Sequence, residues 1–133
     1  MNHQYKLTLN DAQVDTLLRA LDLYARVGCG QFEEIARLFR LDSRCGENVD
    51  GVEIHRLLGA IKQHLFSQHD GGSYSICSRE VPVDYRLAWD VFQVVRYCVS
   101  WERFPEGGNT VNFDLPMNTS GRAFCVVERQ PCQ

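Results

Sequence analysis

The longest apolar segment of the chain, residues 85–101, sets the strongest limit on how the protein can fold. Its apolar side chains cover nearly the whole circumference of a helix. Such a helix must be covered on several sides, either by its own chain or by a partner chain. Pro82 and Asp84, directly before it, are residue types that open helices. We therefore expect a central helix around which other elements pack.

Three further segments show the 3.6-residue periodicity of amphipathic helices. The first follows Asn10, an N-cap residue to which Gln13 can reach back, and it ends at the glycines of residues 28–30. The second and third are expected over residues 31–40 and 52–67. The side chains expected to face the core are Val14, Leu17, Leu18, Leu21 and Ala25 in the first helix, Phe32, Ile35, Ala36 and Phe39 in the second, and Ile54, Leu57, Leu58, Ile61 and Leu65 in the third.

Apolar and polar residues alternate with the period of a strand near both ends of the chain. Residues 110–114 and 123–128 predict a hairpin joined by a loop at 116–121, and residues 5–9 predict a possible third strand. The predicted fold class is therefore α+β: a mainly helical single domain over residues 1–133, with about four helices and a small antiparallel β element. Residues 1–4 and 129–133 are expected to be loose.

Composition narrows the classes of function. A formal charge of 14 − 17 = −3 does not provide the basic face with which proteins bind nucleic-acid phosphates. No segment approaches the roughly 20 apolar residues that span a bilayer, and the first six residues lack the apolar core of a signal peptide. We therefore expect a cytoplasmic protein that binds neither nucleic acid nor a membrane.

The cysteines and histidines give no pattern of a metal site. None of the six cysteines forms a Cys-x-x-Cys pair, and none of the four histidines has a neighbour at the spacing of a helical zinc motif. No cofactor is therefore expected, and in a reducing compartment the thiols stay free. Cys29, between two glycines, is expected to be the most exposed thiol, whereas Cys98 is expected to be a small buried hydrophobe.

The loop after the first predicted hairpin strand carries groups that can bind an anion. Thr119, Ser120 and Arg122 offer two hydroxyls, a guanidinium and a flexible backbone within four residues. Such a turn can form an anion-binding nest. The alternative is an ordinary hairpin loop, which is rich in the same residue types.

Aromatic residues at the end of the long helix extend this candidate site. Trp101 and Phe104 flank Arg103 there, where they can stack on a planar ligand or anchor a partner, while Trp89 and Tyr97 are assigned to core packing. Together the candidate ligand-binding residues are Arg26, Trp101, Arg103, Asn112, Thr119, Ser120 and Arg122; no residue is predicted to be catalytic.

Two stretches of the sequence carry a family resemblance. Residues 24–35 (YARVGCGQFEEI) and residues 101–121, with WERFPEGG, VNFD, Pro116 and TSG, resemble small uncharacterised proteins encoded by tailed bacteriophages. The resemblance covers residues 7–124. This group has no assigned activity, so it implies no catalytic residues. It implies a class of roles, in which a small protein binds a host protein or sequesters a host signalling nucleotide.

Three hypotheses of function follow. The first is a non-catalytic phage accessory protein that binds a host factor, either a protein or a signalling nucleotide, for counter-defence or host takeover. The second is a small metal-dependent nucleotide hydrolase that uses Asp22, Glu33 and Glu34 at a metal ion. The third is a structural module that forms homo-oligomers through the long apolar helix.

Overall fold

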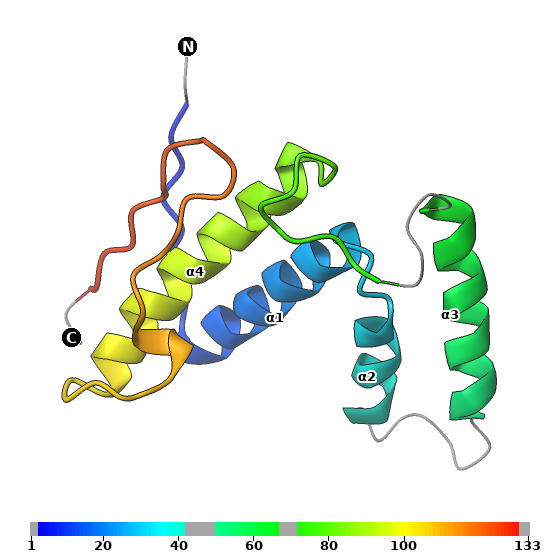
Figure 1. The fold of residues 1–133 in the computed structure, drawn as a ribbon. Coiled ribbons are helices and arrows are strands. Elements are labelled where there is room, and N and C mark those ends of the chain that lie inside the picture. Colours follow the sequence, from blue (N-terminus) through cyan, green and yellow to red (C-terminus); the bar gives the residue numbers. More distant parts are fainter. Residues whose placement is uncertain (1–2, 42–49, 67–71, 131–133) are drawn as a thin grey trace.

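A computed structural model describes residues 3–41, 50–66 and 72–130, with the side chains of residues 40 and 41 left aside. In this part the chain forms the helices α1 (Asp11–Gly28), α2 (Glu33–Leu41), α3 (Gly51–Leu65) and α4 (Val83–Arg103), and the short 3-10 helix η1 (Val111–Phe113). Helices α1 and α4 pack side by side as the body of the molecule (Figure 1). Helices α2 and α3 form a hairpin-like arm at the end of α1, and all four predicted helices are thereby confirmed.

Helix α1 begins and ends where the sequence predicts. Asn10 Oδ1 accepts a hydrogen bond from the Gln13 N–H at 2.9 Å, and Gln13 Oε1 accepts one from the Asn10 N–H at 2.9 Å. This reciprocal capping box satisfies two amides that have no partner inside the helix. At the other end Gly30 adopts a φ of 87°, a left-handed conformation that glycine adopts without steric cost. The chain can therefore turn sharply into α2.

Helix α4 is the central helix that the apolar segment predicts. It runs antiparallel to α1, since Tyr85 near its start contacts Gly28 at the end of α1, and Arg103 at its end pairs with Asp15 near the start of α1. The C-terminal segment, residues 114–130, crosses another side of α4 (Figure 1). Much of the apolar circumference is thus covered by the chain itself. Leu87 and Trp101 remain 37% and 39% exposed.

The predicted β element is wrong, because the described residues contain no strand. Within the predicted first hairpin strand residues 111–113 form η1, and residues 123–128 run as irregular chain. The backbone of residues 117–120 bonds to side chains of α4 instead of to a neighbouring strand, and Pro116 has no N–H to give to a ladder. Alternation of residue types cannot form a sheet without such a neighbour.

The N-terminal segment shows the same failure of the alternation pattern. Residues 5–9 form no strand, and Tyr5 and Leu7 are 90% and 75% exposed. Their side chains therefore have no buried face to occupy.

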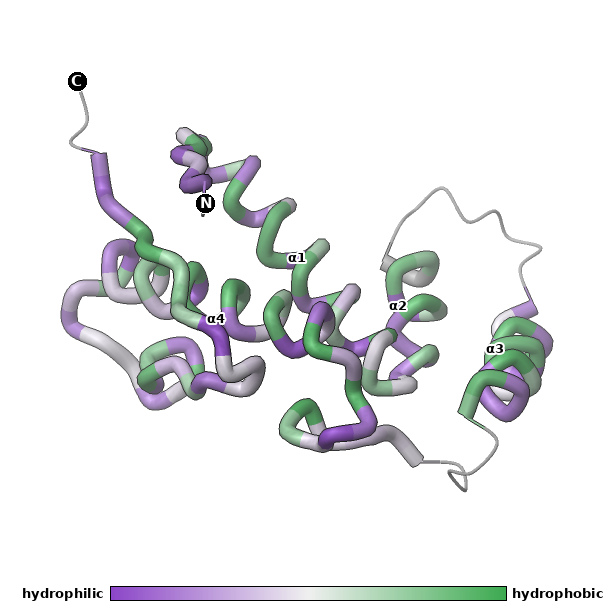
Figure 2. The backbone as a smooth tube through the Cα atoms, turned by 90° about the horizontal axis from the view of Figure 1, so that it is seen from above, coloured by the Kyte–Doolittle hydropathy of each residue, from purple (hydrophilic) through white to green (hydrophobic). Residues whose placement is uncertain are grey.

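The arm also departs from the predicted core. In and before α2, Phe32 and Ala36 are buried as predicted, but Phe39 is 52% exposed. No residue of α3 is buried, although five of its residues were expected to face the core. Figure 2 shows hydrophobic residues on successive turns of α3, which stands apart from α4. The cause is that α3 packs against α2 alone among the helices.

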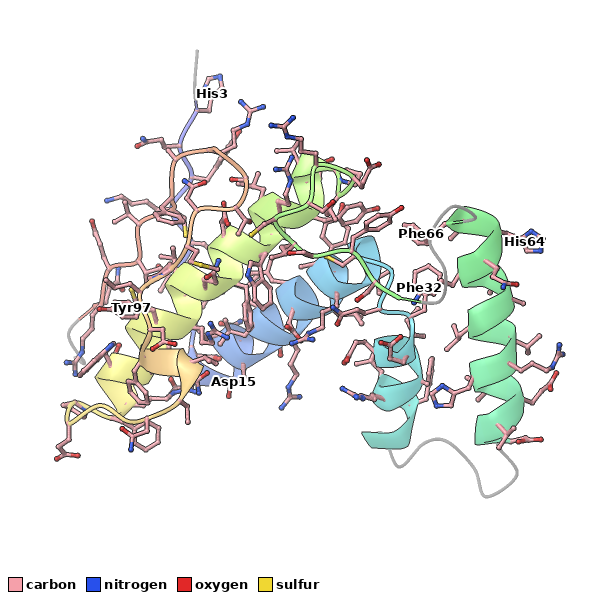
Figure 3. All side chains as sticks on the ribbon, viewed as in Figure 1. His3, Asp15, Phe32, His64, Phe66 and Tyr97 are labelled. Carbon is pink, nitrogen blue, oxygen red and sulfur yellow. The ribbon has the colours of Figure 1, made fainter. Side chains whose placement is uncertain are left out.

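The C-terminal end of the arm returns to the body through three aromatic rings. Phe66, the residue that follows α3, lies with its ring centroid 5.9 Å from that of Phe32 and 5.9 Å from that of Tyr74. Figure 3 shows Phe66 and Phe32 facing each other across the gap between α3 and the start of α2. This aromatic contact fixes the end of α3 beside the turn between α1 and α2.

Candidate functional site

The residues predicted to bind a ligand do not converge on one place. Thr119 and Ser120 lie against Asp90, in the first half of α4, whereas Trp101 and Arg103 lie at its C-terminal end. At 1.5 Å per residue, positions 90 and 101 are about 16 Å apart along the helix. The hairpin that was expected to bring these groups together does not form.

The hydroxyl groups of Thr119 and Ser120 are committed to Asp90. Asp90 Oδ1 accepts a hydrogen bond from the Thr119 N–H at 2.8 Å and lies 2.7 Å from the Thr119 hydroxyl. Asp90 Oδ2 accepts from the Ser120 N–H at 2.9 Å and from the Ser120 hydroxyl at 2.5 Å. Asp90 is only 2% exposed. Burial acts to raise the pKa of Asp90, but the hydrogen bonds from Ser120 and Thr119 outweigh it and lower the pKa. The ordinary-loop alternative therefore describes these two residues better than an anion-binding nest.

A second polar side chain of α4 holds the same segment. Gln93 Nε2 donates to the Met117 carbonyl at 2.9 Å, and Gln93 Oε1 accepts from the Met117 N–H at 3.0 Å. Gln93 is buried, as is Asp90, and a buried polar group is stable only when it is hydrogen-bonded. We call Asp90, Gln93 and the backbone of residues 117–120 the C-terminal clasp. Its role in the structure is to fasten the C-terminal segment to α4.

The other predicted residues do not form a common site. Arg103 and Trp101 make contacts that stabilise the fold, whereas Asn112 and Arg122 are exposed. Arg103 donates to Asp15 Oδ1 at 3.0 Å and to Asp11 Oδ1 at 3.4 Å, and so ties the end of α4 to the start of α1. Trp101 packs edge-on against Phe113, with ring centroids 5.3 Å apart. Asn112 in η1 and Arg122 in the C-terminal segment are exposed.

Arg26 is a predicted residue that borders a hollow. A groove of about 500 Å³ lies between the end of α1, residues 73–76 and Trp89 of α4. The Tyr74 N–H donates to the Cys29 carbonyl at 2.8 Å, which holds residues 73–76 beside the end of α1. We call this hollow the Arg26–Trp89 groove. The groups in it that can contact a ligand are those of Arg26, Gln31, Ser73, Tyr74, Ser75 and Trp89.

The guanidinium of Arg26 is positioned from both sides. Its Nε donates to Asp22 Oδ1 at 2.9 Å, its Nη1 donates to Gln31 Oε1 at 3.0 Å, and its Cζ lies 6.0 Å from the centre of the Trp89 ring. Burial acts to lower the pKa of Arg26, but the hydrogen bond and charge of Asp22 outweigh it and raise the pKa. These two bonds leave further N–H donors of the five on a guanidinium. Arg26 therefore presents a fixed positive charge at the edge of an aromatic face.

A second guanidinium approaches the same indole. Arg96 Cζ lies 5.9 Å from the Trp89 ring centre and 4.9 Å from that of Phe92. Its Nε is buried and has no hydrogen-bond partner among the described residues. Burial lowers the pKa of Arg96, and the more distant charges of Asp22 and Asp114 offset this only in part. The surface around Trp89 thus carries two positive charges, with the carboxylate of Asp22 bonded to Arg26 and those of Glu34 and Asp114 farther away.

Cys29 lines the groove but does not have the predicted exposure. It is 3% exposed, and burial raises the pKa of its thiol. The flanking glycines account for this, because Gly28 packs on Tyr85 and Gly30 on Phe66, so the turn is enclosed. Cys98 is half-buried, Cys77 is exposed, and Cys45 and Cys132 lie outside the described residues.

The carboxylates of the hydrolase hypothesis do not gather into a metal site. In residues 3–41, 50–66 and 72–130, no three His, Cys, Asp or Glu side chains come close enough together to hold a metal ion. Asp22 is paired with Arg26, and Glu34 is paired with Arg37. Among the described helices there is also none with the length and apolar character needed to cross a membrane.

Comparison of the chain with models of protein families finds no match, and neither do comparisons with curated proteins and with solved structures.

Sequence reasoning had placed Trp89 in the core, so it missed the aromatic part of the groove. A signal was present, since residues 89, 92 and 96 share one face of a helix at spacings of three and four.

Proposed function

We propose that the protein is a non-catalytic binding protein that captures a small, planar, negatively charged molecule in the Arg26–Trp89 groove. The observation that carries the proposal is the Arg26 guanidinium held 6.0 Å from the centre of the Trp89 ring at the edge of a groove of about 500 Å³. That volume lies within the range of about 300–1,000 Å³ that small-molecule sites occupy.

The chemistry of the lining favours a nucleotide as the ligand class. A guanidinium binds phosphate or carboxylate oxygens through paired N–H donors. The ring of Trp89 stacks on that of Phe92, with centroids 4.9 Å apart, and the part of the indole that this stack leaves accessible can contact a planar ring. The side chains of Ser73, Ser75 and Gln31 add donors and acceptors that can contact a sugar or a base edge. Sequestering a host signalling nucleotide, one of the roles that the phage resemblance implies, is the biological setting that we propose.

Tryptophan fluorescence offers a direct test, because the chain has two tryptophans. In a Trp101→Phe variant Trp89 is the one remaining tryptophan, so quenching by an added ligand reports on the groove. We expect a panel of cyclic and ADP-ribose-type nucleotides, titrated by calorimetry and fluorescence, to include a member that quenches Trp89 and releases heat.

Two arginine variants locate the site. Arg26→Gln is expected to weaken binding about tenfold or more, because it removes a charge-assisted contact. Arg103→Gln is the matched control. Each variant breaks Arg–Asp pairing, within α1 for Arg26 and between α4 and the start of α1 for Arg103, but Arg103 lies far from the groove and its replacement should leave affinity unchanged. The small-ligand proposal fails if no nucleotide gives heat or quenching, and binding of a host protein then remains as the other form of the first hypothesis.

A further inference from the structure

The arm carries an apolar surface that residues 3–41, 50–66 and 72–130 leave exposed. Leu57, Ile61 and Leu65 follow one another at four-residue spacing along α3 and are 47%, 49% and 65% exposed. Residues at this spacing lie above one another on one face of a helix. We call them the α3 stripe. On α2, Leu38 and Phe39 are 42% and 52% exposed as well.

The geometry of the arm explains why the stripe is uncovered. Helix α2 has nine residues and α3 has fifteen, which at 1.5 Å per residue are about 13 Å and 22 Å long. The short helix covers the side of α3 that carries Ile54 and Leu58, which are half-buried. On a helical projection the α3 stripe is the row of residues next to Ile54 and Leu58, on the side turned away from α2. A helix of this pattern that buries no residue lacks a second packing partner.

The charges of the arm indicate what kind of partner fits. Glu34 pairs with Arg37 at 2.8 Å within α2, and Glu53 pairs with Arg56 at 2.8 Å within α3. These acidic and basic groups neutralise each other on their own helices, so they do not favour a partner of opposite charge. Two identical arms can therefore meet without leaving the charges of these two pairs unbalanced, which would otherwise oppose association.

We propose that two copies of this chain associate through their α3 stripes, with the two helices antiparallel about a two-fold axis. In this arrangement Ile61 lies near the axis against its own copy, and Leu57 of one protomer meets Leu65 of the other, as an isologous interface requires. The five exposed side chains of the arm offer roughly 500 Å² of apolar surface per copy, less than the ~800 Å² that each partner gives to a standard interface and of the size found in weak, concentration-dependent association. The result is a four-helix arrangement of two arms, which buries the apolar face that α2 alone cannot cover.

Sedimentation or light scattering of the full chain over a concentration series tests the proposal. The wild-type chain of 15.3 kDa should approach twice that mass at tens of micromolar. Ile61→Glu places a charge at the centre of the interface, and we expect it to weaken self-association by more than about 100-fold. Because Ile61 is half-exposed in the protomer, the far-ultraviolet circular dichroism of the variant should match that of the wild type.

Val52→Glu is the matched control. It makes the same type of change in the same helix, at a residue that is 82% exposed and about 180° around α3 from Ile61. It should leave self-association unchanged. A wild-type monomer at 100 μM would overturn the proposal, and so would a dimer that tolerates Ile61→Glu or is lost equally in Val52→Glu. The measurement is made without nucleotide, and none of the three stripe residues lines the Arg26–Trp89 groove, so failure of this proposal and failure of the nucleotide proposal can be told apart.

Discussion

Replacement of Asp90 by asparagine tests whether the C-terminal clasp stabilises the fold. The new amide keeps one oxygen, which can still accept from Thr119, but its NH₂ group faces the Ser120 N–H that had donated to Oδ2 at 2.9 Å. One charge-assisted hydrogen bond is lost, and a partly buried donor is left opposite another donor. Each of these effects costs about 1–3 kcal/mol. We therefore expect Asp90→Asn to lower the free energy of unfolding by about 3 kcal/mol and Tm by about 10 °C.

Urea unfolding followed by circular dichroism measures this change, with Glu106→Gln as the control. Glu106 is an exposed carboxylate in the loop after α4, and such surface changes stay within about 0.5 kcal/mol. Amide exchange at Thr119 and Ser120 should accelerate in Asp90→Asn. Equal urea midpoints for Asp90→Asn and the wild type would refute the reasoning, since a satisfied buried carboxylate cannot be neutralised without cost.

The pH dependence of the same variant has a definite sign. The hydrogen bonds lower the pKa of Asp90 in the folded state, relative to about 3.9 in an unfolded chain. Its contribution to stability is therefore fully present above about pH 4 and is lost as pH falls through the folded-state pKa. The difference in unfolding free energy between wild type and Asp90→Asn should consequently narrow below about pH 4.

Three further predictions follow from packing and exposure. Gly28→Ala should destabilise the fold by about 1–3 kcal/mol in urea unfolding, because a Cβ at this position overlaps the ring of Tyr85 in α4. Gly59→Ala is the contrasting change in α3, where a Cβ meets open space, and it should stabilise the fold by about 0.5–1 kcal/mol. Arg103→Ala should cost about 1 kcal/mol or less, and the cost should shrink in 1 M salt. With Ellman's reagent the exposed Cys77 should react in the folded state, while the buried Cys29 should react only on unfolding.

The helices could be predicted from the sequence because their signals are local. The capping box of Asn10 and Gln13 joins residues three apart, and the turn at Gly30 needs nothing beyond the glycine itself. The prediction of strands was wrong, because a strand depends on a partner that its own residues do not specify. The path of the C-terminal segment is set by the hydrogen bonds from Thr119 and Ser120 to Asp90, about thirty residues earlier in the chain. No local pattern reports such a contact.

The candidate site shows the same limit in a different way. Trp89 and Trp101 stand twelve residues apart in one helix, so they lie about 120° apart around its axis. Their residue types do not say which one borders a hollow. The end of α1 and residues 73–76 decide it, since both lie beside Trp89. Arg26 is among the ligand-binding residues predicted from the sequence, but its aromatic neighbour Trp89 comes from another helix.

The ring of Phe66 links two parts of the molecule that would otherwise act separately. It touches Phe32, at the start of the arm, and Tyr74, in the wall of the Arg26–Trp89 groove. A displacement of the end of α3 therefore changes the support of a side chain that a ligand would meet. Thermodynamic linkage requires such an effect to be mutual: if pairing of two arms alters ligand affinity by some factor, the ligand alters the pairing equilibrium by the same factor. The arm would then serve as a sensor of occupancy as well as a contact surface.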